Sequence, residues 1–255
     1  MNLFRKAVLA LKVVGTVRNW PDYFRDLFGA VRTRTFILIL RNGQSFVLRS
    51  GTADRGILHE VWALKEYPFP ADAAGGDVVD IGAQIGIFAC YAAHNGARVF
   101  AYEPEEANYA LLLENVRRNG LERNIRPFRL AVSDRKKSLP LYLNEKNTGG
   151  HSAVFKSGKK VKAQAVSLND VFSENGIRHC ALLKMDTEGS EYPILYGASD
   201  DVLRRITHIQ MEWHPVDGKR GYTVDALTAF LKGKGFEVRI TRKPNYLYAE
   251  RKKKV

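Results

Sequence analysis

Cysteine is scarce in this chain of 255 residues, which contains only Cys90 and Cys180. The two lie far apart in apolar stretches without C-x-x-C spacing, so the sequence gives no sign of a disulfide framework. Such thiols are typical of a reduced, cytoplasmic protein in which both are buried. The chain is long enough to bury roughly 70–75% of its unfolded surface, as one large domain or as a domain with a small appendage.

A long hydrophobic run is also missing. The opening stretch MNLFRKAVLALKVVGTVRNW resembles a signal peptide at first sight, but Lys12 interrupts it and no small-residue cleavage site follows. It is too short and too charged to span a bilayer. A helical wheel separates a polar side from an apolar side, namely Arg5, Lys12, Thr16 and Asn19 against Phe4, Val8, Leu11 and Val14. We therefore expect a basic amphipathic helix, which either docks on the protein's own body as a lid or lies on an anionic membrane.

Acidic residues are too few to balance the basic ones, and the formal net charge is +13. Residues 1–50 contain nine basic and two acidic residues, and so do residues 231–255, whereas the stretch between them is close to neutral. A nucleic-acid enzyme is expected to spread positive charge around its active face. Basic ends instead suit an acidic partner or an anionic membrane, although the tail RKKKV also fits a solvated chain end.

Strands and helices alternate through most of the chain. Residues 77–81, 97–104 and 124–134 have the pattern of strands, and helical stretches over 85–96 and 105–120 separate them. Further strands are predicted at 181–186, 206–213, 236–240 and 246–250, and a further helix at 223–235. This alternation implies βαβ units, and therefore an α/β fold with a parallel sheet covered by helices.

Two additions to this pattern are predicted. An extension over residues 1–70 contains the amphipathic helix, a β-hairpin over 35–50 that turns at Asn42-Gly43, and a helix over 53–67. The main domain then spans residues 71–255. Inside it, short alternating runs around a Gly-, Ser- and Asn-rich stretch predict an insertion of antiparallel strands near 138–166, with a mobile loop.

The first strand of the main domain ends in a glycine loop, VVDIGAQIGIF, in which Asp80 precedes Gly82 and Gly86 opens a helix. The dinucleotide pattern G-x-G-x-x-G is absent, because Gln84 replaces its second glycine. A loop with an acid at its head favours a ligand without phosphates, and S-adenosylmethionine is such a ligand, with a cationic sulfonium and amino group opposite Asp80. We expect the backbone of this loop, including Ala83, to face the methionine part of the cofactor.

The next two strand ends carry polar groups as well. Glu103 follows the second strand, where its carboxylate can accept hydrogen bonds from both ribose hydroxyls. Ser133 and Asp134 end the third strand, where a side chain can receive the adenine amino group. Three consecutive strand ends therefore predict an S-adenosylmethionine site along one edge of the sheet.

The fourth strand ends in a dense group of charges, Lys184, Asp186, Glu188 and Glu191. Charges are costly to desolvate unless they are paired, so such a group more often faces a cleft than a core. Asp186 is then expected beside the transferable methyl group, with Lys184 as a counterion. The alternative is that the carboxylates only cap the helix that starts near Ser190.

Five segments carry a family resemblance: VVDIGAQIGIF, AYEPEEANYALLLENVRRNG, RLAVSD, GGHSAVF and above all LLKMDTEGSEYPIL. They are similar to those of FkbM-type S-adenosylmethionine-dependent methyltransferases, over about residues 35 to 215. The resemblance implies the seven-stranded class I methyltransferase sheet, Rossmann-like with helices on both faces. It also implies methylation of hydroxyl oxygens, often on sugars, glycolipids or natural products. Gln84 and Asn169 depart from the family pattern, which usually has Asn and Asp there.

Methyl transfer to a hydroxyl requires alignment of the two groups and a base that removes the hydroxyl proton. Four side chains are candidates, Asp186 and Glu188 after the fourth strand and Glu212 and His214 after the fifth. His214 has the better unperturbed pKa, whereas a carboxylate would need a pKa raised by burial or by like-charged neighbours.

Three further residues are predicted to contact the methyl acceptor, and the presence of a metal ion stays open. The family resemblance implies that His151 and Ser152 contact the substrate, and Lys184 is placed with them. A divalent metal held by Asp186 and Glu212 is an alternative that the sequence does not lead us to expect.

Two other classes of function remain alternatives. An RNA methyltransferase would share the cofactor site and could use the basic ends of the chain, but the Asp or Asn followed by Pro-Pro and an aromatic is absent after the fourth strand, where DTEGSE stands. No cysteine fits attack on a pyrimidine carbon. A binding module that kept only the fold is the second alternative. We therefore expect a cytoplasmic O-methyltransferase, in peripheral contact with an anionic membrane if its basic ends serve that purpose.

Overall fold

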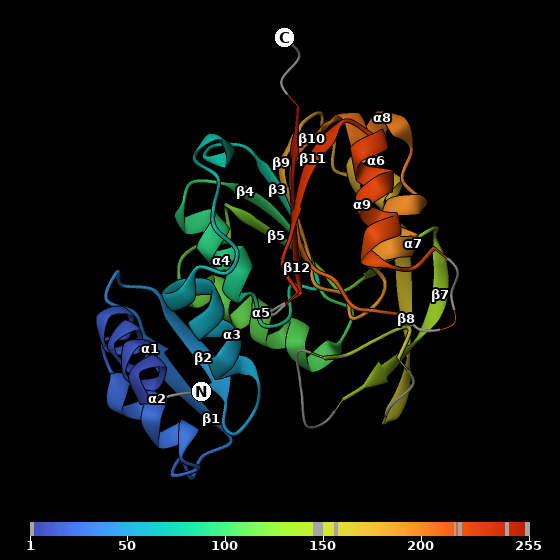
Figure 1. Cartoon of the computed structure of the whole chain (residues 1–255). Helices are drawn as coiled ribbons and strands as arrows, with labels where there is room; N and C mark the ends of the chain where they lie inside the picture. Colours follow the sequence, from blue (N-terminus) through green and yellow to red (C-terminus); the bar gives the residue numbers. More distant parts are fainter. Residues whose placement is uncertain are drawn as a thin grey trace.

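The computed structural model describes residues 3–144, 150–155, 158–216, 218, 221–242 and 245–252. A seven-stranded sheet forms the centre of the molecule (Figure 1). Its spatial order is β5 (Ile125–Phe128), β4 (Arg98–Tyr102), β3 (Asp77–Ile81), β9 (Cys180–Met185), β10 (Ile206–Glu212), β12 (Tyr246–Arg251) and β11 (Phe236–Ile240). Only β12 runs antiparallel to its neighbours, β10 and β11. The predicted methyltransferase sheet, closed by an antiparallel hairpin, is confirmed.

Helices cover both faces of this sheet. They are α4 (Ile87–His94) and α5 (Glu106–Arg118) on one face, and α6 (Leu168–Glu174), α7 (Glu191–Tyr196), α8 (Asp200–Arg204) and α9 (Val224–Gly233) on the other. Alternate strand residues serve the two faces, so Val78 joins the first apolar cluster and its neighbour Val79 the second. Cys90 and Cys180 are both buried and unpaired, as expected.

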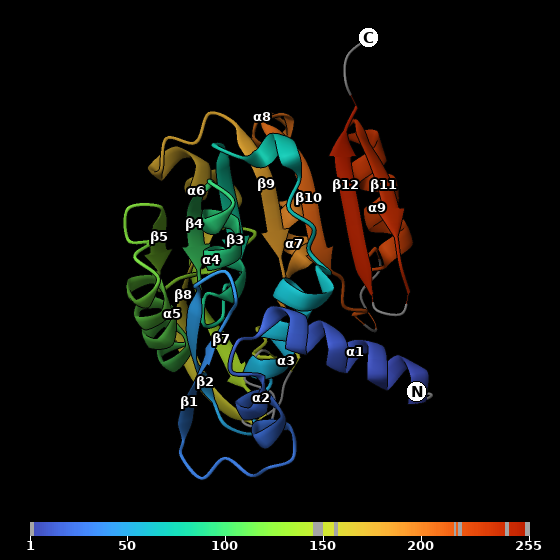
Figure 2. The same cartoon turned by 90° about the vertical axis from the view of Figure 1, so that its left-hand side faces the viewer.

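An N-terminal layer, residues 3–67, lies beside the edge at which the parallel strands end (Figure 2). It consists of α1 (Leu3–Thr16), α2 (Trp20–Leu27), the hairpin β1 (Thr35–Ile39) and β2 (Ser45–Arg49), α3 (Asp54–Leu58) and the π-helix η1 (His59–Leu64). The chain then passes along the sheet to the short 3₁₀-helix η2 (Ala71–Ala73) at the opposite edge, where the parallel strands begin. The predicted hairpin is confirmed. The helix predicted over 53–67 is present over residues 54–64, but it changes from α3 into the π-helix at His59 and ends earlier than predicted, at Lys65, which has φ 55°.

Two residues on the predicted apolar side of α1 are exposed and do not dock on the protein's own body. Val8 and Leu11 are 37% and 70% exposed, whereas Val13 and Val17 are 2% and 1% exposed. The helix packs on η1, and Val17 forms a β-bridge with Leu40. The contacts at the C-terminal end of α1 therefore decide which of its residues are buried. Among the described helices, none has both the length and the apolar composition that a membrane crossing requires.

The predicted β insertion is present as a separate sheet in the order β6 (Ala131–Ser133), β8 (Lys159–Ser167), β7 (Lys137–Leu143), with β7 and β8 antiparallel. The single strand predicted over 124–134 is wrong, because the chain leaves the central sheet after β5 and pairs again as β6 with β8. Part of the predicted mobile loop, residues 145–149 and 156–157, lies outside the described residues, as does the end of the basic tail.

Candidate active site

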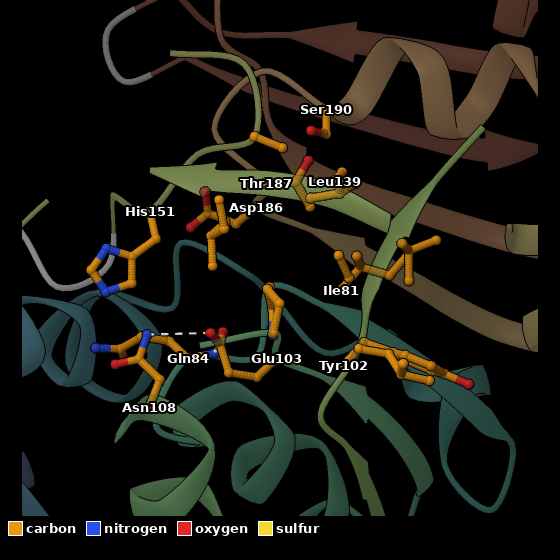
Figure 3. A pocket seen from close by; sticks show the side chains of 17 residues that line it. Ile81, Gln84, Tyr102, Glu103, Asn108, Leu139, His151, Asp186, Thr187 and Ser190 are labelled. Atoms are coloured by element: carbon orange, nitrogen blue, oxygen red, sulfur yellow. Dashed lines mark hydrogen bonds between the residues drawn. The ribbon is translucent and has the colours of Figure 1, made fainter. Parts of the chain in front are cut away.

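A pocket opens at the carboxyl edge of the sheet, where β3, β4 and β9 end (Figure 3). The central sheet supplies Gly82, Glu103 and Asp186, one from each of these strand ends, and the insertion supplies His151. The reversal of strand order between β3 and β9 places this pocket where open α/β sheets bind their ligands. Its position agrees with the cofactor site predicted from the sequence.

Two glycines of the loop after β3 are required by close packing. Gly82 has φ +77°, and a Cβ there would lie 1.9 Å from the carbonyl oxygen of Asp186. Gly86 has φ +84°, and a Cβ there would lie 2.5 Å from Cδ1 of Leu112. The first glycine lets the ends of β3 and β9 meet, and the second lets α4 approach α5.

Glu103 is a buried carboxylate, 4% exposed, that lines the pocket. One oxygen accepts the backbone N–H of Gln84 at 2.9 Å, and the other accepts the N–H of Glu105 at 2.9 Å. Burial raises the pKa of Glu103 to about 7, although these N–H groups act in the opposite direction. The backbone thus holds a carboxylate in position at the pocket wall.

Gln84 also connects the cofactor loop to the N-terminal layer. Its φ is +50°, and its side-chain amide donates a hydrogen bond to the carboxylate of Asp54. Asp54 is fully buried and receives the guanidinium of Arg49 through both of its oxygens, at 2.8 and 2.9 Å. A residue at the first position of α3 therefore fixes the loop that lines the pocket.

Asp80 and Lys184 form a buried ion pair beneath the loop, with Nζ 3.3 Å from Oδ1. Nζ also donates a hydrogen bond to the carbonyl oxygen of Gly82 at 3.1 Å. Burial lowers the pKa of Lys184, but the charges of Asp80 and Asp186 outweigh burial and raise it. Neither Asp80 nor Lys184 lines the pocket, so the pair supports the loop from below.

The remaining predicted cofactor residues lie next to the pocket. Ala83 is buried and does not line it. The Ser133 hydroxyl donates to Asp134 at 3.0 Å, and Lys137 also binds Asp134, which lowers the pKa of that carboxyl. The wall near β6 is formed instead by residues 130–132. The adenine contact through Ser133 and Asp134 stays a prediction.

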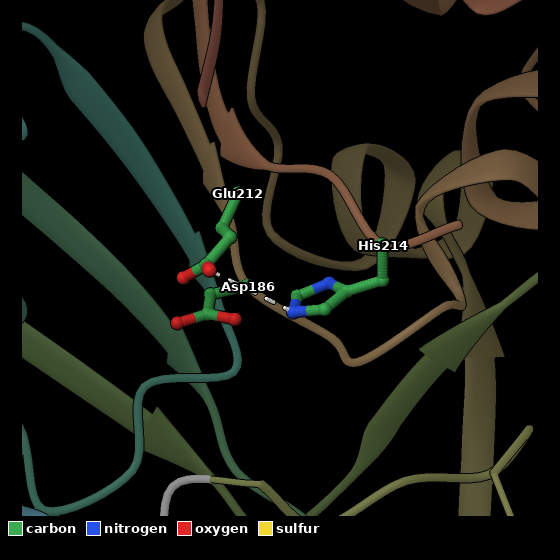
Figure 4. A group of neighbouring side chains, drawn as sticks. All are labelled: Asp186, Glu212 and His214. Atoms are coloured by element: carbon green, nitrogen blue, oxygen red, sulfur yellow. Dashed lines mark ion pairs between the residues drawn. The ribbon is translucent and has the colours of Figure 1, made fainter. Parts of the chain in front are cut away.

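An acidic cluster adjoins the pocket at Asp186 (Figure 4). Around His214, Nδ1 lies 3.0 Å from Glu191, while Nε2 lies 3.4 Å from Glu188 and 4.0 Å from Glu212. The structure thus brings together the four predicted catalytic residues. Glu191 differs from the others, since its carboxylate is fully buried and accepts the N–H groups of residues 187 and 189. Those N–H groups lie in the turn before α7 and not in the helix, so the helix-capping alternative stays a prediction.

Burial and mutual repulsion control the charges in this cluster. Burial, followed by the charge of Asp186, raises the pKa of Glu212 to about 7. Burial alone would lower the pKa of His214, but the hydrogen bond that its Nδ1–H donates to Glu191 and the charges of the surrounding carboxylates raise it to about 10. His214 is therefore an imidazolium at neutral pH when its only partners are these carboxylates.

Glu60 and Tyr67, two residues of the N-terminal layer near this cluster, were not predicted as site residues. Burial and then the charge of Asp186 raise the pKa of Glu60 to about 7. The pKa of Tyr67 rises as well, through burial and the same Asp186 charge. Glu60 lies in the π-helix, a feature that is frequent at functional sites, but its only sequence signal is a carboxylate among the apolar residues of LHEVWAL.

The insertion contributes one pocket residue and one anchor. His151 lines the pocket, and its Nδ1 accepts the backbone N–H of Asn144 at 3.0 Å. The Ser152 hydroxyl donates to the carbonyl oxygen of Glu188 at 2.6 Å and accepts the N–H of Val154 at 2.9 Å. Ser152 thus ties the insertion to the turn after β9.

Comparisons with known proteins identify the family of this chain. The model of the methyltransferase FkbM domain matches residues 80–238. The chain is 32% identical to the 31-O-demethyl-FK506 methyltransferase FkbM of Streptomyces tacrolimicus, over 69% of this chain and 78% of that protein. It is 28% identical to the methyltransferase sdnD of Sordaria araneosa, over 63% of this chain and 73% of that protein. The crystal structure of an FkbM methyltransferase from Methylobacillus flagellatus KT matches with a TM-score of 0.49 and 17% identity, over 69% of this chain and 44% of that chain. The chain belongs to the FkbM family of S-adenosylmethionine-dependent methyltransferases.

Proposed function

We propose that this enzyme transfers a methyl group from S-adenosylmethionine to a hydroxyl oxygen of a sugar, a glycolipid or a natural product. The observation that carries this proposal is the position of Asp186, which lines the cofactor pocket and also belongs to the acidic cluster. A hydroxyl placed there would contact carboxylates and lie beside the pocket. The Streptomyces relative is named as a methyltransferase of 31-O-demethyl-FK506, which supports transfer to an oxygen.

The proposed reaction is an in-line displacement in which the acceptor oxygen bonds to the methyl carbon while the sulfur–carbon bond breaks. The hydroxyl proton passes to a base within hydrogen-bond reach. Asp186 and Glu212 are better candidates than His214, because an imidazolium has no free lone pair to accept a proton. In the described part of the chain, the Asp186 carboxylate has no hydrogen bond or ion pair, so it is available to the acceptor.

The proposal is tested by supplying the purified enzyme with S-adenosylmethionine labelled in its methyl group and with fractions of a cell extract. We expect the label in a glycolipid or small-molecule fraction, as a methyl ether that survives mild alkali. Label recovered as methylated RNA bases would overturn the proposal. RNA is not favoured, because the sequence DTEGSE replaces the base-amine signature after β9.

A second proposal concerns the location of the enzyme, since glycolipid acceptors lie in membranes. In the described residues, all exposed large hydrophobic side chains fall within the N-terminal layer: Val8, Leu11, Trp20, Leu27, Phe28 and Ile37. Exposed basic side chains alternate with them along the chain, among them Lys12, Arg18 and Arg25. We propose that this layer binds an anionic membrane surface, since apolar and basic groups together favour such binding.

The protein is therefore expected to float with vesicles that contain anionic lipid and to dissociate as salt is raised, because screening weakens the attraction. Phe28→Glu and Leu11→Glu should weaken flotation, since these side chains are 79% and 70% exposed and can change without loss of core packing. Glu237→Gln, at an exposed position of β11, serves as the control. Equal flotation with neutral and anionic vesicles would contradict the proposal.

A further inference from the structure

Three side chains of the acidic cluster have the spacing of metal ligands. One atom each of Asp186, Glu212 and His214 lies within 4.8 Å of the other two (Figure 4). Ligands held at about 2.0–2.6 Å from one cation lie within about 5 Å of one another. The three residues come from the adjacent ends of β9 and β10, whose parallel pairing fixes their relative positions.

The orientation of His214 is a second, independent observation. Nδ1 faces the buried Glu191 carboxylate at 3.0 Å, which fixes Nδ1 as a hydrogen-bond donor and directs Nε2 toward Glu188 and Glu212. Histidines that bind metals usually donate their second ring nitrogen to a carboxylate in this way. Glu191 is held in turn by two backbone N–H groups, so the ring orientation is built into the turn after β9.

The charge and the polar groups around the cluster also favour a cation. Among the described residues, no lysine or arginine forms an ion pair with Asp186, Glu212 or Glu60, and Lys184 is paired with Asp80. Within the part of the chain that the structure describes, the buried Tyr67 hydroxyl has no hydrogen-bond partner, although the charges of Asp186, Glu212 and Glu60 all act on it. A buried hydroxyl left unpaired beside carboxylates is a group that a bound ion or its water ligand would satisfy.

We infer that Asp186, Glu212 and Nε2 of His214 bind a divalent cation of the Mn²⁺ or Mg²⁺ class beside the cofactor pocket. Carboxylate oxygens suit these cations, and neutral imidazole is a frequent ligand of transition metals. The cation would put positive charge next to the acceptor oxygen and make its proton easier to remove, a role that rests on the proposed O-methylation. Binding itself requires neither acceptor nor turnover.

The test measures binding of Mn²⁺ alone. The full chain is stripped with a chelator, the chelator is removed, and Mn²⁺ is added while the electron paramagnetic resonance signal of free Mn²⁺ is recorded. We expect one bound Mn²⁺ per chain, with coupling to a single imidazole nitrogen in the bound signal. Glu212→Gln should weaken binding at least tenfold, whereas the matched control Glu237→Gln should not change it.

Three outcomes would overturn the inference: no bound Mn²⁺ at millimolar concentration, binding without nitrogen coupling, or equal affinity in the parent and Glu212→Gln. The coupling of bound Mn²⁺ to an imidazole nitrogen is measured in the parent protein, so the inference can still be tested if a variant fails to fold. If Mn²⁺ binds as expected while labelled methyl groups appear in RNA, the cation site stands and the proposed function fails. If labelled methyl ethers form and Mn²⁺ does not bind, the proposed function is supported and the cation site is refuted.

Discussion

Replacement of Asp186 by asparagine is expected to lower turnover about a hundredfold or more, while cofactor binding stays close to that of the parent. The carboxylate lines the pocket at the end of β9, beside the acidic cluster, and its change to an amide keeps the shape but removes the charge. Asp186 is tied to β3 through its backbone N–H, which donates to the carbonyl oxygen of Ile81 at 3.0 Å. The fold should therefore tolerate the change.

Turnover and S-adenosylmethionine affinity are measured separately, the first with labelled cofactor and the second by calorimetry. Asp201→Asn, at an exposed position of α8, is the matched control and should behave as the parent. Near-full turnover of the Asp186 variant would move the base to Glu212. An Asp186 variant that does not fold would show that the Asp186 carboxylate stabilises the fold and does not act only on the acceptor.

Glu103→Ala is expected to weaken S-adenosylmethionine binding by about 2 kcal/mol, or about thirtyfold, the cost of losing a charge-assisted hydrogen-bonding group. The reason is that Glu103 is held at the pocket wall by the N–H groups of Gln84 and Glu105, in position to accept ribose hydroxyls. Calorimetry gives the affinity, and a melting curve checks that the variant folds. Glu106→Ala, one position into α5 with a largely exposed carboxylate, is the control, and unchanged affinity in Glu103→Ala would refute the assignment.

The same carboxylate predicts a pH dependence of binding. Because burial raises the pKa of Glu103 to about 7, the carboxyl of the free enzyme is mostly charged at pH 8 and mostly protonated at pH 6. If the charged form binds the ribose, affinity should fall about tenfold as the pH drops from 8 to 6. Glu103→Ala should lose this part of the pH dependence, so parallel profiles for the variant and the parent would contradict it.

Much of the central fold could be predicted because its signals are local. The strand at 77–81, for example, alternates with helical patterns, and the parallel sheet follows from that alternation. The break between β5 and β6 could not be predicted, since Ala131–Ser133 have strand-forming residues and only tertiary pairing with β8 decides which sheet they join. The wheel pattern of α1 likewise left open what its apolar side contacts, because packing on η1 decides which of its residues are buried.

The residues of the candidate site could be predicted where they stand at the ends of strands. Gly82 and Glu103 stand at strand ends, so their place in the pocket follows from the order of elements. Asp80 and Lys184 stand there too, yet they face each other beneath the loop, which only the packed structure shows. Glu60 belongs to no recognisable sequence motif. It is more than a hundred residues from Asp186 in the sequence, and only the docking of the N-terminal layer brings the two carboxylates close enough to interact.

The contact between Gln84 and Asp54 has a consequence for local unfolding. If the N-terminal layer detaches, the cofactor loop loses the acceptor of its Gln84 side chain, and the apolar cluster that includes Leu58, Val78 and Ile85 is opened to water. The match to the family model begins only at residue 80, but the cooperative unit begins earlier. Cofactor binding should therefore stabilise the N-terminal layer against local unfolding. A membrane that binds this layer would in turn change the affinity of the pocket for the cofactor.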